Sequence, residues 1–235
     1  MNSITSFDIE LQSKLDHLKI HSAYLPHIGL NYNEARVKTF IIAESHYLPK
    51  KHNNKFSAKD WYFNSELIYK ILNENPKWHK SWFNTRNVIK TYQDNSNLEK
   101  GHGIFNNLEK TYHTINEEIN LFEECVYLNY FQRPSEVEGD SISVHKIDSE
   151  IALKNLMVIC EVLKPNKIIF VSSKAHKDFT NNVSKEQSKI LPYVGAVPHP
   201  SASSWWNRKS KQYGLGGEAV TGREKFIRIM SPQKK

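Results

Sequence analysis

Val37-Lys38-Thr39-Phe40-Ile41-Ile42 is a run of β-branched and aromatic residues that leads directly into the polar group Ala43-Glu44-Ser45-His46-Tyr47. Runs of this composition predict a strand. In an open α/β sheet, the carboxyl end of a strand is the usual place for a ligand. Three further runs predict strands of the same kind, over residues 125–131, 167–171 and 190–197.

The segments around these strands have helical spacing of their apolar residues, three or four positions apart. Strands that alternate with helices predict βαβ units and a parallel sheet covered on both faces. We therefore expect a three-layer α/β/α fold with a central, mainly parallel four-stranded sheet. The expected helices cover residues 3–25, 61–73, 103–119 and 148–163, with mixed helix and loop over 76–102, a connector over 26–33, and a last helix or edge strand over 226–230.

Composition narrows the class of protein. The chain has 235 residues, is 39% apolar and 24% charged, and has no linker or repeat, so we expect a single domain over residues 1–235 and a monomer. No run approaches the roughly 18 apolar residues of a membrane span. Residues 1–8 lack the basic and apolar regions of a secretory signal.

The two cysteines indicate the compartment in which the protein works, and the net charge indicates the kind of partner that it binds. Cys125 and Cys160 stand in apolar surroundings, so we expect buried thiols in the reducing cytoplasm. No group of cysteines and histidines has the spacing of a zinc site, and we expect no metal. The formal net charge of +7 favours an anionic partner and makes nucleic acid plausible.

Each predicted strand ends in polar side chains, which in a parallel sheet meet at one edge. Glu44 follows the first strand, Asn129 ends the second, Ser172 and Ser173 follow the third, and His199 follows the fourth. We therefore expect these side chains to converge on one crevice.

His199 lies between two prolines in Val197-Pro198-His199-Pro200-Ser201, and Trp205-Trp206 and a basic segment, residues 207–211, follow. Proline fixes its own φ and favours extended geometry in the residue before it. The backbone of His199 is therefore stiff and suited to presenting an imidazole at the edge of the sheet.

In this order, the ends of the strands resemble the uracil-DNA glycosylase superfamily over about residues 37–204. The family's first motif, Gly-Gln-Asp-Pro-Tyr or Gly-Glu-Ala-Pro-Gly, is similar to Ala43-Glu44-Ser45-His46-Tyr47, and a following Phe-Ser is similar to Phe56-Ser57. Val126-Tyr127-Leu128-Asn129 is similar to the family's Leu-Leu-Leu-Asn. Ser172-Ser173-Lys174-Ala175 is similar to Gly-X-X-Ala, and His199-Pro200-Ser201-Ala202-Ser203-Ser204 is similar to His-Pro-Ser-Pro-Leu-Ser.

The resemblance implies a DNA glycosylase that hydrolyses the N-glycosidic bond of a flipped-out uracil or other deaminated or damaged base, without a cofactor. Glu44 would orient the water and His199 would stabilise the leaving base, which is the chemistry that an oxocarbenium-like sugar and a departing base anion require. The base would be bound by Tyr47, Phe56 and Asn129. Contacts with DNA, single- or double-stranded, would come from Ser45, His46, Ser172, Ser173, Ser201, Ser203, Trp205, Arg208 and Lys209, with Lys51, Lys55 and Lys211 as further phosphate-binding candidates and Trp205 as the wedge into the base stack.

The sequence also departs from the family's motifs. Ser45 stands at the aspartate of the first form, His46 at its proline and Ser203 at the wedge leucine, and Ala43 and Ser172 replace glycines. Two alternative functions therefore stay open: a catalytically silent protein of the same fold that binds nucleic acid or a nucleotide, and a hydrolase that acts on a small nucleoside.

Structural interpretations of the same residues also stay open. Glu44 is suited to pairing with a basic side chain or capping a helix, and Ser172 and Ser173 are suited to capping the helix that they precede. The other structural interpretations are a strand-end cap for Asn129, an exposed loop position for His46, side-chain packing for Phe56, Tyr47 and the Trp205-Trp206 pair, and a solvated face for the basic segment.

Overall fold

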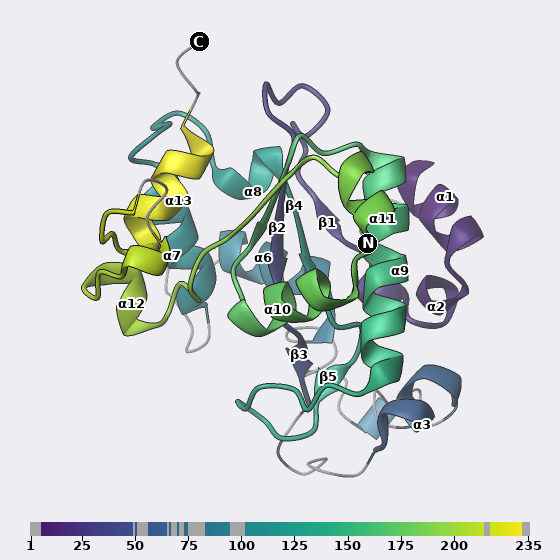
Figure 1. Cartoon of the computed structure of the whole chain (residues 1–235). Coiled ribbons are helices and arrows are strands. Elements are labelled where there is room, and N and C mark those ends of the chain that lie inside the picture. The colour runs from purple at the N-terminus through teal and green to yellow at the C-terminus, as the bar shows by residue number, and fades with distance from the viewer. Residues whose placement is uncertain are drawn as a thin grey trace.

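The computed structural model describes residues 6–48, 50, 56–64, 66, 70, 73–74, 83–94, 102–213 and 217–231. At its centre is a five-stranded sheet with the order β1-β4-β2-β6-β7 (Figure 1). β2 (Thr39–Ala43), β4 (Cys125–Asn129), β6 (Lys167–Phe170) and β7 (Tyr193–Ala196) are mutually parallel. The predicted three-layer α/β/α class with a mainly parallel sheet is confirmed.

The sheet has one strand more than the sequence predicts. β1 (His27–Ile28) pairs antiparallel with β4 at the edge, inside the segment that we expected to be a connector. Two residues are too few to show the alternation that identifies a strand. Gly29 explains why the chain turns so close to the sheet, because a Cβ there would lie 2.3 Å from the carbonyl oxygen of Glu123.

Helices cover both faces of the sheet. α1, α2 and α9 lie on one side, and α7, α12 and α13 lie on the other (Figure 1). The helices of the described residues are α1 (Ser6–Lys14), α2 (Asp16–Ile20), η1 (Ser22–Tyr24), α3 (Ala58–Phe63), α6 (Thr85–Asp94), α7 (Gly103–Tyr112), α8 (Leu121–Glu124), α9 (Lys146–Leu163), α10 (Ser173–Asn182), α11 (Lys185–Ile190), α12 (Ser203–Trp206), η4 (Lys211–Tyr213) and α13 (Gly222–Met230).

Alternation along the strands divides the core in two. Phe40 and Ile42 of β2 belong to the cluster beneath α1 and α9, whereas Ile41 and Ala43 belong to the cluster beneath α7 and α13. Because successive side chains of a strand point to opposite faces, one run of apolar residues supplies both clusters. Cys125 and Cys160 are buried thiols, as predicted.

Some predicted boundaries shift. The fourth parallel strand, β7, is shorter than the predicted range 190–197. The helix α11 extends to Ile190, and Pro192 lies between it and β7. The chain end at 226–230 is helical, because Thr221 and Glu224 form a capping box that starts α13. Parts of the predicted segments 61–73 and 76–102 lie outside the described residues. None of the described helices is long and apolar enough to cross a membrane.

Two short strands form a second sheet beyond the carboxyl end of β2. β3 (His46–Tyr47) pairs in parallel with β5 (Pro134–Ser135). The chain turns from β2 to β4 on one side of the main sheet and from β6 to β7 on the other. β2 and β6 are neighbours whose connections leave in opposite directions, so their carboxyl ends form the topological switch point where open α/β sheets bind ligands.

Candidate functional site

Glu44 lies at this switch point and connects its two sides. It follows the last residue of β2, and its Oε2 accepts a hydrogen bond of 2.8 Å from the hydroxyl of Ser172, which follows β6. Ser172 is 3% exposed and is also the N-cap of α10, where its Oγ accepts from the amide of Ala175. The predicted convergence of these two strand ends is therefore a direct contact.

A loop from β5 to α9 covers the other carboxylate oxygen. The hydroxyl of Ser141 and the amide of Ile142, at 3.2 Å, both donate to Oε1 of Glu44. Lys174 of α10 donates to the carbonyl of Ile142, at 2.7 Å, and so holds the same loop. Together with Ser172, these donors fix the orientation of the Glu44 carboxylate. No local pattern indicated this clamp of three donors on Glu44, because the donors lie 97, 98 and 128 positions away along the chain.

His199 stands where β7 gives way to a loop, as predicted. The amide of Ser201 donates to its Nδ1, at 3.2 Å. Nδ1 is therefore an acceptor, and the neutral ring carries its proton on Nε2. Although the residue is exposed, neighbouring protein atoms desolvate the ring and lower the pKa of His199, and the negative charge of Glu44 acts in the opposite direction. Glu44 is thus close enough to act on the imidazole electrostatically.

Asn129 and Tyr47 lie at the same edge of the sheet. Asn129 ends β4 directly beside Ala43 of β2 and is 6% exposed. Tyr47 is 39% exposed. Partial burial raises the pKa of its phenol, and the charges of Glu44 and Asp140 add to that rise. Tyr47 is therefore near the carboxylate of Glu44, while Asn129 forms the adjacent wall.

Two predicted contact residues lie inside the protein instead. His46 is 5% exposed; its Nε2 shares a hydrogen bond of 3.0 Å with Thr85, and its ring packs against Tyr24 and Phe83. Trp205 is completely buried against Phe226. These positions correct the expectation that His46 contacts DNA and that Trp205 is the wedge, because neither ring reaches solvent.

Phe56 and Ser45 also take part in packing. Phe56 is half-buried against the core cluster that includes Leu48 and Trp61. Ser45 is 9% exposed, and its hydroxyl makes no hydrogen bond among the described residues. The hydroxyl of Ser45 therefore does not face open solvent.

Trp206, and not Trp205, is the exposed tryptophan of α12. It is 41% exposed, and the guanidinium of Arg223 lies over it, 5.6 Å from the ring centre. Adjacent residues of a helix point in different directions, and in α12 Trp205 faces the core while Trp206 faces outward. The sequence could not show which of the two tryptophans faces outward, and Arg223 was not expected at all.

The remaining predicted contact residues lie near the surface. Ser173, Ser201, Ser203, Arg208, Lys209 and Lys211 are exposed. Lys209 lies 3.9 Å from Glu224, and the side chain of Asn107 holds the His199 loop by donating to the carbonyl of Pro200. Lys51 and Lys55 lie outside the described residues.

Within the described ranges, no group of three or more acidic, histidine or cysteine side chains is arranged to hold a metal ion. No protein-family model matches the chain, and no curated protein matches it.

Proposed function

We propose that the chain is a DNA glycosylase-like hydrolase that cleaves the N-glycosidic bond of an extruded uracil or other deaminated or damaged base. The observation that carries the proposal is a carboxylate, Glu44, that is held at the switch point of the sheet and is close enough to act electrostatically on His199, whose Nε2 carries the proton. A carboxylate and a neutral donor at one crevice match the two charges that develop when a glycosidic bond breaks.

The proposed reaction uses water and no cofactor. The oxygen of water forms a bond to C1′ of the sugar, and the bond from C1′ to the base nitrogen breaks with its electron pair leaving on the base. Glu44 orients the water and offsets the positive charge on the sugar. Nε2–H of His199 donates a hydrogen bond to the oxygen of the departing base, and the proton that water loses ends on the base.

The segment that follows His199 along the chain is suited to DNA. Trp206, Arg208 and Lys209 are exposed, and the half-buried Arg223 lies over the ring of Trp206, so the segment presents an aromatic face and cationic side chains. Base-processing enzymes extrude their target, and aromatic side chains stack on exposed bases, while lysine and arginine neutralise phosphates. We propose Trp206, rather than Trp205, as the residue that contacts the base stack.

One observation favours a catalytically silent protein that binds nucleic acid in the same crevice. Oε1 of Glu44 already accepts two hydrogen bonds from the loop at Ser141 and Ile142, and Oε2 accepts one from Ser172. A carboxylate offers about four acceptor positions, so only one remains for water.

Base release from oligonucleotides distinguishes these functions. The substrates are single- and double-stranded oligonucleotides that carry uracil, hypoxanthine or xanthine, with the free nucleosides alongside. Wild type is compared with Glu44→Gln and His199→Ala, and with two matched controls at exposed positions, Glu34→Gln and His145→Ala.

Base release by wild type and both controls, together with loss in Glu44→Gln and His199→Ala, is the expected result. Salt-dependent binding of DNA without base release would favour the silent protein. Release from nucleosides only would favour the small-molecule hydrolase. If wild type shows no base release and no DNA binding, the proposal is overturned.

A further inference from the structure

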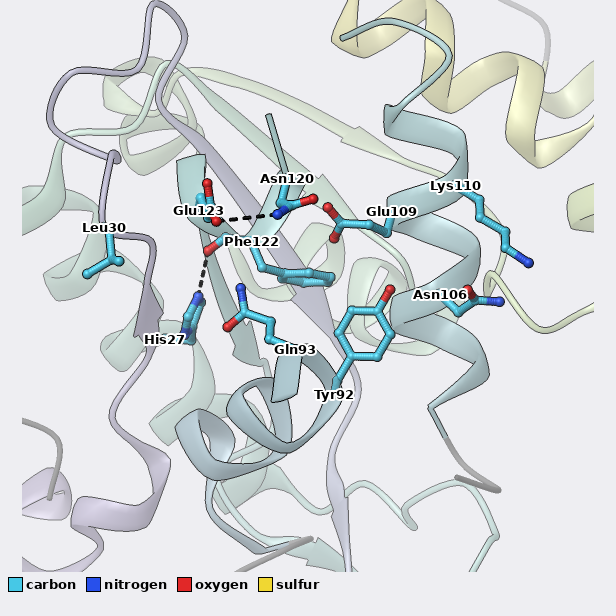
Figure 2. Close-up of a pocket in the computed structure, with 10 residues that line it drawn as sticks. All are labelled: His27, Leu30, Tyr92, Gln93, Asn106, Glu109, Lys110, Asn120, Phe122 and Glu123. Carbon is cyan, nitrogen blue, oxygen red and sulfur yellow. Dashed lines mark hydrogen bonds between the residues drawn. The ribbon is translucent and has the colours of Figure 1, made fainter. Parts of the chain in front are cut away.

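A cavity of about 630 Å³ lies away from the switch point, among β1, α6, α7 and α8 (Figure 2). Phe122 and Glu123 on its wall immediately precede β4, so the cavity is near the amino end of that strand. Its volume is in the range that holds an organic molecule. The residues that line it are His27, Leu30, Tyr92, Gln93, Asn106, Glu109, Lys110, Asn120, Phe122 and Glu123.

Glu109 is the buried charged group of this cavity and is 8% exposed. Its Oε1 accepts a hydrogen bond of 2.7 Å from the amide of Leu121. Its Oε2 makes no hydrogen bond among the described residues, although the amide of Phe122 lies near enough to favour the carboxylate form. This oxygen is therefore a buried polar atom of a cavity-lining residue that a ligand is able to satisfy.

The acidic side chains that line the cavity are Glu109 and Glu123. Burial raises the pKa of Glu109, and the charge of Glu123 adds to that rise, against the lowering effects of the Leu121 amide and of His113. Burial together with the charge of Glu109 raises the pKa of Tyr92 to about 12. His113 lies 3.8 Å from Glu109, and Figure 2 shows the side chain of Lys110 directed away from Glu109.

Aromatic rings and amides complete the wall. Tyr92 and Phe122 meet edge to face, with ring centres 5.9 Å apart and planes at 76°. The amide side chains of Gln93 and Asn120 lie beside this corner (Figure 2). The described residues of the cavity hold no metal-binding group of three ligands, and the cavity is much larger than an ion. A flat cation satisfies both the rings and the carboxylates, because guanidinium groups stack on aromatic faces and pair with carboxylates through parallel hydrogen bonds.

We propose that this cavity binds the guanidinium or amidinium group of an organic ligand, with Glu109 as the counter-ion and Tyr92 and Phe122 as the aromatic wall. Such a group occurs on free small molecules and on arginine side chains of other proteins. The site is separate from Glu44 and His199, so the inference does not depend on the proposed hydrolase.

Three probes of similar size distinguish the charge and the shape of the group that the cavity is expected to bind. Benzamidine is flat and cationic, benzamide is flat and neutral, and benzylamine is cationic but not flat at the nitrogen. Isothermal titration calorimetry on the full chain at low ionic strength should show binding of benzamidine that is at least about tenfold tighter than binding of either other probe.

Two variants and a control assign the binding to this cavity. Glu109→Gln keeps an acceptor for the amide of Leu121 but removes the charge, and we expect it to weaken benzamidine binding about tenfold or more. Asn106→Arg places a tethered guanidinium one helical turn from Glu109 and should abolish binding while leaving the fold intact. Glu34→Gln, an exposed carboxylate outside the cavity, should bind as wild type does.

A blocked arginine peptide identifies the source of the group. Binding of acetyl-arginine-amide as tight as that of benzamidine assigns the cavity to an arginine of a partner protein, and weaker binding assigns it to a free ligand. Failure of benzamidine to bind, equal binding of all three probes, or unchanged binding in Glu109→Gln would overturn the proposal.

Discussion

Acidification should destabilise the protein through the buried pair His17 and His21. The rings lie 4.7 Å apart, and His21 is 3% exposed, stacks on Trp61 and shares a hydrogen bond with its carbonyl. Burial lowers the pKa of His21 to about 4. Burial, with the charge of His21 as a smaller cause, lowers the pKa of His17 to about 3. Both rings are therefore neutral in the folded protein at pH 5.

The size of this loss of stability follows from the difference between the histidine pKa values of the folded and unfolded states. An unfolded histidine takes up its proton near pH 6.5, whereas folded His21 does so near pH 4, so stability is complete above pH 6.5 and is lost as the pH falls toward 4. At pH 5 the loss from His21 is about 2 kcal/mol, which is roughly 1.36 kcal/mol for each of the 1.5 pH units below 6.5. His17 adds a similar amount, so the pair contributes up to about 4 kcal/mol.

Urea unfolding at pH 7 and pH 5, followed by tryptophan fluorescence, measures this effect. His21→Phe keeps a ring against Trp61 but cannot take up a proton, so its loss of stability between the two pH values should be about 2 kcal/mol smaller than that of wild type. His145→Ala, an exposed control, should behave as wild type does. An equal loss in His21→Phe and wild type would refute the reasoning.

Arg133→Met should lower the free energy of unfolding by about 3–5 kcal/mol in urea titrations, because it leaves the completely buried carboxylate of Asp148 without its cationic partner. A loss of stability below about 1 kcal/mol would contradict a buried ion pair. Trp205→Ala should cost about 3–5 kcal/mol in the same assay. Trp206→Ala should cost less than about 1 kcal/mol of stability and, in fluorescence anisotropy with a labelled single-stranded oligonucleotide, weaken binding about tenfold; the reverse pattern would return the DNA contact to Trp205. Gly29→Ala should destabilise the β1 edge by about 1–3 kcal/mol, measured as a lower melting temperature.

The order of strands and helices along the chain could be predicted because it depends on local patterns. β-branched and aromatic runs identified the four parallel strands, and helical spacing identified α9 to within two residues. The same spacing placed the start of α7 correctly but extended it to residue 119, whereas the helix ends at Tyr112. The strand β1 was not predicted, because two residues are too few to show an alternation of apolar and polar side chains. Its position depends on the close approach of Gly29 to the backbone of Glu123, just before β4.

The candidate site was predictable only as a set of strand ends. The rule that parallel strands end at one edge brought Glu44, Ser172, Asn129 and His199 together before any contact was known. It did not predict how each side chain is used. His46 follows Glu44 by two positions, yet it packs into an aromatic cluster with a hydrogen bond to Thr85.

The sequence by itself determined the layer architecture, the edge of the sheet that holds the candidate site and the stiff backbone of His199, because periodicity, strand polarity and proline geometry act over a few residues. Only the tertiary structure decided the loop clamp on Glu44, the outward position of Trp206 and the charged cavity around Glu109. Each of these depends on groups that are remote in sequence and packed together in space, and no local pattern encodes such a contact.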